Sequence, residues 1–72
     1  MKLQIWLKSG QDIVIDGVTS VKAFSAEEKF FVYDEHNFQD FVCRSKRTYN
    51  IFASDGFYSV SGEAIDCVHF IT

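Results

Sequence analysis

The sequence predicts an all-β protein: a small single-domain barrel or strongly bent antiparallel sheet, SH3-like or similar. Apolar and polar residues alternate along most of the chain, which is the pattern of half-buried strands. Turn residues divide the chain into six or so short segments, and proline is absent. With 72 residues there is room for a single small β domain, residues 1–72. At most one short helical turn is expected, near residues 36–43.

The segments KLQIWLK and DIVID predict the first two strands. Ile5 and Leu7 share one face of the first strand, and Trp6 lies on the other. A three-residue loop over residues 9–11 would pair Ile5 with Ile15 and keep the apolar faces together. Because a slip of one residue exchanges the two faces, this register is preferred to a two-residue turn.

The segments VTSVKAF and KFFVY predict two more strands, which follow a turn at Asp16 and Gly17. Ser25 and Glu28 have the spacing of a helix capping box, which competes with this interpretation. A helix starting there would carry its apolar stripe into the acidic pair at 34–35, so we predict a turn at SAEE. The segment HNFQDFVCR fits either one helical turn or a short strand.

The segment YNIFASDGFYSVSG predicts a hairpin, because Asp55 and Gly56 are a favoured pair for a type I′ turn. That turn would pair Ala53 with Tyr58 and make Phe52 and Phe57 diagonal neighbours on a polar face. The opposite face is predicted to be core and consists of Ile51, Ala53, Tyr58 and Val60. The last segment, AIDCVHFIT, is apolar on both faces, which predicts a strand covered on both sides.

Composition narrows the class of protein. The net charge of −3 argues against a general affinity for nucleic acid or anionic membranes. No apolar run approaches the roughly 18 residues that a membrane span requires. Polar residues interrupt the apolar start of the chain, so no signal peptide is predicted and we expect a cytoplasmic protein. Cys43 and Cys67 are then expected to be reduced.

The residue pattern does not favour catalysis or a cofactor. Cys67 and His69 are two apart on a predicted strand, so their side chains run parallel and are not aimed at each other. Adding His36 and Cys43 completes a Cys₂His₂ set, but its spacing lacks the usual zinc knuckle. The four glycines are scattered singly, which leaves no phosphate-binding loop. We therefore expect a non-enzymatic protein without metal or cofactor.

Binding is the class that the sequence favours. The segment CRSKRTYN holds three of the seven basic residues and is followed by aromatic residues, and another aromatic residue lies on the first strand. Our hypothesis is a protein-interaction module that binds another protein or itself through an exposed aromatic face. The alternative is single-stranded nucleic-acid binding, with phosphates on the basic segment and bases on the rings. The predicted binding residues are Trp6, Arg44, Lys46, Arg47, Tyr49, Phe52 and Phe57.

Overall fold

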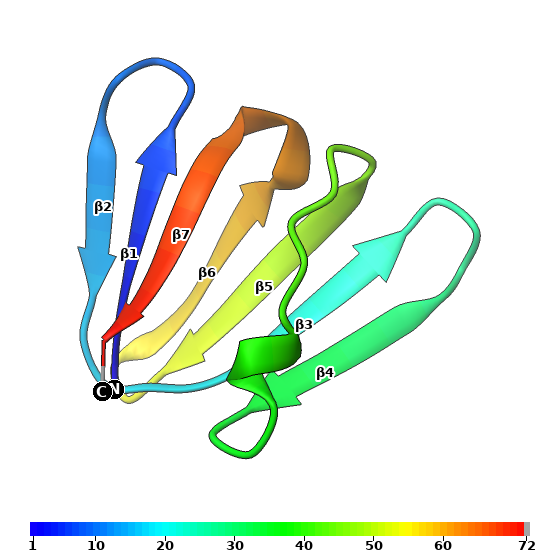
Figure 1. The fold of residues 1–72 in the computed structure, drawn as a ribbon. Coiled ribbons are helices and arrows are strands. Elements are labelled where there is room, and N and C mark those ends of the chain that lie inside the picture. Colours follow the sequence, from blue (N-terminus) through cyan, green and yellow to red (C-terminus); the bar gives the residue numbers. More distant parts are fainter. Residues whose placement is uncertain (72) are drawn as a thin grey trace.

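The computed structural model describes residues 1–71 and contains seven strands and two single-turn 3₁₀ helices (Figure 1). No helix in this part of the chain is long and apolar enough to cross a membrane. The all-β class is confirmed. The elements are, in chain order, β1 (Lys2–Leu7), β2 (Asp12–Ile15), β3 (Val18–Ser25), β4 (Phe30–Asp34), η1 (Phe38–Asp40), β5 (Arg47–Ala53), β6 (Gly56–Ser61), η2 (Gly62–Ala64) and β7 (Ile65–Ile71).

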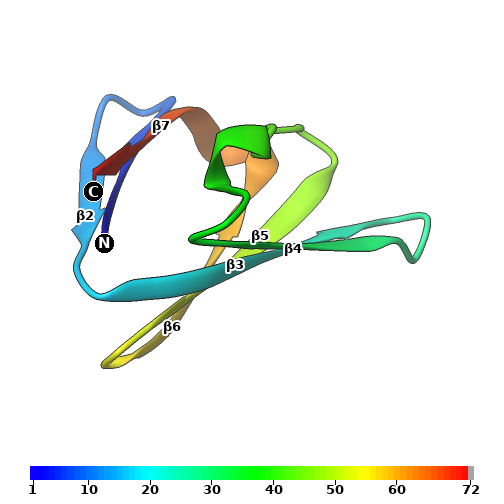
Figure 2. The ribbon, with the colours of Figure 1, turned by 60° about the horizontal axis from the view of Figure 1, so that its bottom comes forward.

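The strands form two antiparallel sheets that bend around one core (Figure 2). The three-stranded sheet has the order β2-β1-β7, and the four-stranded sheet has the order β4-β3-β5-β6. The chain passes from the first sheet to the second through Gly17, whose φ of 69° is a left-handed conformation that suits glycine. Within residues 1–71 the two sheets remain separate and do not close into a barrel. The observed form is therefore the strongly bent sheet.

The core lies between the inner faces of the two sheets, and the segment around η1 covers one side of it. Phe38 of η1 stacks on Phe70 at a centroid distance of 4.5 Å, and Phe41 packs edge-on against Phe70 at 5.3 Å. The helical turn expected near residues 36–43 is observed as η1, whereas η2 is a second turn that was not predicted. The buried hydrophobic residues are Leu3, Ile5, Ile15, Val18, Val21, Ala23, Tyr33, Phe38, Tyr49, Ile51 and Ile65.

Two hairpin loops have the same three-residue geometry. In the first, Leu7 N–H donates to Gln11 O and Gly10 N–H donates to Leu7 O. In the second, residues 26–28 repeat this pattern between Ser25 and Lys29, as the SAEE turn predicted. The first loop is therefore residues 8–10, and the predicted loop over 9–11 is wrong.

The position of Gly10 explains the difference between the predicted and the observed register. Such loops end in a left-handed residue, and Gly10 supplies it with a φ of 94°. Ile5 consequently pairs with Ile13, and Ile15 pairs with Leu3. The shift is two residues along one strand, so every side chain stays on its predicted face.

The second loop places Glu28 where the first places glycine, at a φ of 62°. Because a side chain in this region costs about 1–2 kcal/mol, we expect Glu28→Gly to raise the free energy of unfolding by about 0.5–1 kcal/mol. Glu27→Gly is the matched control, since Glu27 does not have a positive φ. The added backbone flexibility should lower the free energy of unfolding of that variant. Urea denaturation compares the two variants. Equal effects would show that the left-handed backbone at 28 carries no strain.

The turn of the β5–β6 hairpin differs from the predicted type I′ turn. Ser54 and Asp55 form the turn, Ala53 pairs with Gly56, and Phe52 lies directly opposite Phe57. Asp55 does not have the positive φ that a type I′ turn requires. Ser54 N–H donates to Gly17 O at 3.1 Å, which ties the end of β5 to the start of β3.

Two predictions of burial are wrong. Tyr58 was assigned to the core, but it is exposed because β6 is an edge strand with little packed against its inner face. Its phenol donates to an Asp55 carboxylate oxygen at 3.2 Å. The strand β7 was predicted to be covered on both sides, but Cys67 and His69 are exposed. Only its inner face, with Val68 and Phe70, packs against the core.

Candidate functional site

Four of the exposed large apolar side chains lie together on the outer face of the four-stranded sheet. Successive residues of a strand alternate between faces, and the buried residues of β3, β4 and β5 define the inner face. The register then places Phe24 opposite Phe30, Lys22 opposite Val32, and Phe52 opposite Phe57 on the outer face. We call this surface the outer aromatic face; its residues are Lys22, Phe24, Phe30, Val32, Phe52 and Phe57.

The rings of the outer aromatic face form two stacked pairs, one toward each end of the sheet. Phe24 and Phe30 lie 6.1 Å apart between centroids, and Phe52 and Phe57 lie 5.6 Å apart. Lys22 Nζ is 5.2 Å from the Phe52 centroid, between the two pairs. The exposed fractions are 61% for Phe30, 63% for Phe57, 43% for Val32 and 40% for Phe24. The surface is therefore apolar at both ends, with a cation between them.

One of the two ring pairs of this surface was predicted from the sequence. Phe52 and Phe57 were predicted to lie on the polar side of their hairpin, and they do. Phe24, Phe30 and Val32 were missed, although the alternation in VTSVKAF and KFFVY contained the necessary information. Once the turn is placed at residues 26–28, these three side chains must share the face opposite the core.

Trp6 lies on a different surface from the phenylalanine pairs. It belongs to β1, on the outer face of the three-stranded sheet, where its ring stacks on His69 at 6.4 Å. Trp6 is half-buried, and its neighbour Val14 is exposed. Since the two sheets turn their inner faces to one core, their outer faces are separate. The structure does not bring Trp6 together with Phe52 and Phe57.

The basic residues occupy a turn before β5. Arg47 N–H donates to Arg44 O at 3.2 Å, and both Arg44 and Lys46 are exposed. Within residues 1–71, none of the three basic side chains of this turn is ion-paired. The guanidinium of Arg47 lies 4.3 Å from the Phe31 centroid, on the inner side of the sheet. Arg47 and Phe52 therefore face opposite sides of β5, as strand alternation requires.

Tyr49 is part of the core and not of a binding surface, because only 1% of it is exposed. Its hydroxyl donates to Val42 O at 2.9 Å and accepts from Arg44 N–H at 2.8 Å. Burial raises the pKa of the Tyr49 phenol, and the hydrogen bond from the Arg44 backbone partly opposes this rise. Tyr49 thus fixes the chain that leads into the basic turn.

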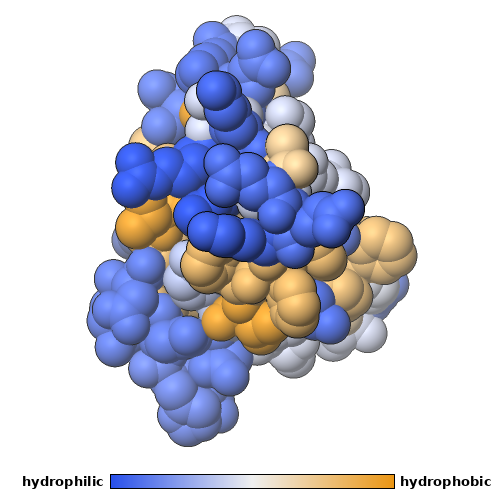
Figure 3. Space-filling view, turned by 90° about the vertical axis from the view of Figure 1, so that its right-hand side faces the viewer, coloured by the Kyte–Doolittle hydropathy of each residue, from blue (hydrophilic) through white to orange (hydrophobic). Residues whose placement is uncertain are grey.

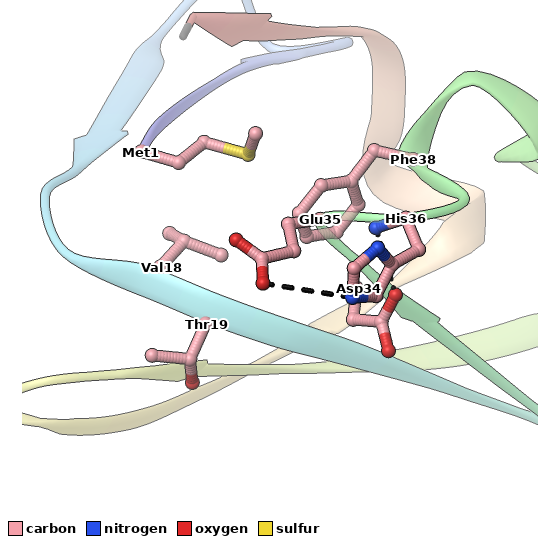
Figure 4. Close-up of a pocket in the computed structure, with 7 residues that line it drawn as sticks. All are labelled: Met1, Val18, Thr19, Asp34, Glu35, His36 and Phe38. Carbon is pink, nitrogen blue, oxygen red and sulfur yellow. Dashed lines mark hydrogen bonds and ion pairs between the residues drawn. The ribbon is translucent and has the colours of Figure 1, made fainter.

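A pocket of about 300 Å³ lies beside η1, at the end of β4 that is formed by Asp34 (Figure 4). His36 and Glu35 form an exposed ion pair at 3.6 Å, and an Asp34 carboxylate oxygen accepts from His36 N–H at 2.9 Å. No cluster of three metal-ligating side chains was found in residues 1–71. The polar side chains of Asp34, Glu35 and His36 bond to one another or to the backbone of the exposed turn after β4, and this pocket is not proposed as a site. Its lining residues are Met1, Val18, Thr19, Asp34, Glu35, His36 and Phe38.

A scan against protein-family models found no match, and neither the search of curated proteins nor that of solved structures found one.

Proposed function

We propose that this protein is a small non-enzymatic interaction module that binds another protein, or a second copy of itself, through the outer aromatic face. The observation that carries the proposal is the exposure of Phe30 and Phe57, each more than 60% accessible. Aromatic side chains grouped on one rigid sheet are typical of binding sites, because they offer a large area and few rotors. The module is proposed to act in the cytoplasm, where its two free cysteines stay reduced.

The arrangement indicates what a protein partner must provide. Burying a fully exposed phenylalanine contributes about 1.5–3 kcal/mol, so two apolar contacts at the ends of the face would dominate the affinity. Lys22 between them favours an acidic group on the partner. Thr48 pairs with Phe24, so the exposed Arg44 and Lys46 lie toward the Phe24–Phe30 end and can steer an acidic partner.

Photo-crosslinking tests this proposal. A benzoylphenylalanine residue is placed at position 30 or at position 57, one at each end of the face, and at position 14 as a matched control, because Val14 is also exposed but lies on the other sheet. In an extract of the source cells we expect a discrete adduct from at least one of positions 30 and 57 and none from position 14. The same adducts from position 14, or none from either end of the face, would contradict the proposed surface.

Single-stranded nucleic-acid binding by the same face is the alternative proposal. Lys22 provides a cation beside the Phe52 ring, on which a base can stack, and the exposed Arg44 and Lys46, which have no ion pair within residues 1–71, provide two more cations in the turn before β5. Three phosphate contacts would make the affinity fall about 40-fold between 50 and 200 mM salt. Fluorescence anisotropy with a labelled oligothymidine measures this, and Arg44→Glu and Phe52→Ala should both weaken binding. No binding at 50 mM salt would eliminate this alternative.

A further inference from the structure

The strand β4 has one open edge. It is the outermost strand of its sheet and, among residues 1–71, pairs only with β3. Ser25 N–H donates to Lys29 O, which makes these two residues a hydrogen-bonded pair of the ladder. Because such pairs alternate along an antiparallel ladder, Phe31 and Tyr33 also bond to β3. Phe30, Val32 and Asp34 therefore direct their backbone N–H and C=O groups to the open edge.

Asn37 caps half of this edge. Its side-chain oxygen accepts from Asp34 N–H at 2.7 Å, and its side-chain nitrogen donates to Val32 O at 3.1 Å. Its backbone N–H donates to Asp34 O at 3.1 Å. Asn37 thus replaces a neighbouring strand along the second half of β4. The groups that remain open are the N–H and C=O of Phe30 and the N–H of Val32.

The open half of the edge is also the apolar half. Phe30 and Val32 carry exposed side chains next to Phe24. The β3–β4 hairpin projects from the rest of the molecule, so its edge is accessible to a large partner (Figure 2). Seen from that side, a hydrophobic patch is bordered by hydrophilic surface above and below (Figure 3). Unpaired and apolar strand edges of this kind favour the addition of another strand.

We infer that a second copy of the chain adds its β4 to this edge, antiparallel and about a two-fold axis at Phe30. The two Phe30 residues then exchange both N–H···O=C bonds, and each Val32 N–H faces the loop at residues 26–28 of the second copy. Phe24 and Phe30 of both copies form one continuous row across an eight-stranded sheet. The inference rests on the proposed function and deepens it, because it names the partner and the end of the face that binds it.

The small number of open groups favours a second copy over a flexible peptide. A peptide could form only about three backbone hydrogen bonds before it met Asn37, and the conformational entropy that it would lose on ordering outweighs so few bonds. The β4 strand of a second copy is already ordered, so this cost is absent. Its donors and acceptors are also self-complementary, as a two-fold contact requires.

Two substitutions at one position separate the backbone contact from the apolar contact. Val32→Pro removes an outward N–H but no bond to β3, because Val32 and Lys22 are a non-hydrogen-bonded pair. We expect sedimentation between 10 µM and 1 mM to show reversible dimers of the natural protein. Val32→Pro should lower the association constant by about tenfold or more, while Val32→Thr, which keeps the N–H, should change it by less than about threefold. Phe57→Ser, at the opposite end of the face, should have no effect.

Hydrogen exchange of the natural protein gives a readout that does not depend on the variants folding. The Phe30 and Val32 amides should become protected as the concentration rises, whereas Ser59, which faces the open edge of β6, should not. Dimers that survive Val32→Pro but are lost with Phe57→Ser would overturn this inference and leave the proposed surface intact. A monomer at 1 mM without added protection would also overturn it and would leave a different protein as the partner.

Discussion

Gly62→Ala is expected to destabilise the domain by about 3 kcal/mol or more, which is a large share of the stability of a chain this short. Gly62 starts η2, and its α-carbon faces the basic turn. A β-carbon there would collide with the carbonyl oxygens of Arg44 and Arg47, the latter at 2.7 Å, and would touch the Tyr49 ring at 3.0 Å. Two of these neighbours are backbone atoms in a turn that cannot move independently.

Urea denaturation followed by Trp6 fluorescence measures the effect of Gly62→Ala. Gly10→Ala is the control, because a β-carbon at Gly10 meets no atom within 4 Å and its cost is limited to the left-handed backbone. We expect about 1–2 kcal/mol for the control. A loss at Gly62 no larger than that at Gly10 would show that η2 does not pack on the basic turn as described.

Tyr49→Phe is expected to cost about 2–3 kcal/mol although it removes only one oxygen atom. That oxygen accepts from Arg44 N–H and donates to Val42 O, and both backbone groups would lose their partner in a part-buried site. Tyr58→Phe is the matched control, since the Tyr58 phenol is exposed and bonds to a solvated carboxylate. We expect less than about 0.5 kcal/mol for Tyr58→Phe, and equal losses in the two variants would contradict the anchoring role of Tyr49.

The raised pKa of Tyr49 adds a dependence on pH. Burial favours the neutral phenol, so the folded-state pKa lies above that of an unfolded tyrosine. The resulting contribution to stability is complete below the unfolded pKa and is lost as the pH rises through the folded pKa. The natural protein should therefore lose stability in strongly alkaline solution, and Tyr49→Phe should lose less. An identical alkaline loss in both proteins would assign the effect to other groups.

Strand alternation predicted which face each side chain occupies better than it predicted the pairing. The registers predicted for the β1–β2 and β5–β6 hairpins were each wrong by two residues, yet Ile5 is buried and Phe57 is exposed as expected. A shift of two residues preserves the faces, because the side-chain period of a strand is two. The exact register depends on which loop residue takes the left-handed conformation. In the loop between β3 and β4 that residue is Glu28, and a preference for glycine at left-handed positions does not identify it.

The candidate site was predicted less well, for reasons of topology. Tyr49 follows the basic residues in sequence, but its hydroxyl bonds to the main chain of residues 42 and 44, which the sequence does not reveal. Trp6 was grouped with Phe52 because each lies on the face of its strand that points away from the core. The two strands belong to different sheets, which separates the two side chains. Arg47 is different: its odd position on β5 already placed it away from Phe52.

The outer aromatic face should be open to solvent in the isolated chain. Relaxation of ring protons by a soluble nitroxide, measured on dilute protein, reports this exposure for each ring. The rings of Phe30 and Phe57 should relax strongly, and those of Phe38 and Tyr49, which are buried, should not. If the Phe30 and Phe57 rings are as protected as Tyr49 at the lowest concentration, the face is already covered within the chain and the proposed binding surface does not exist.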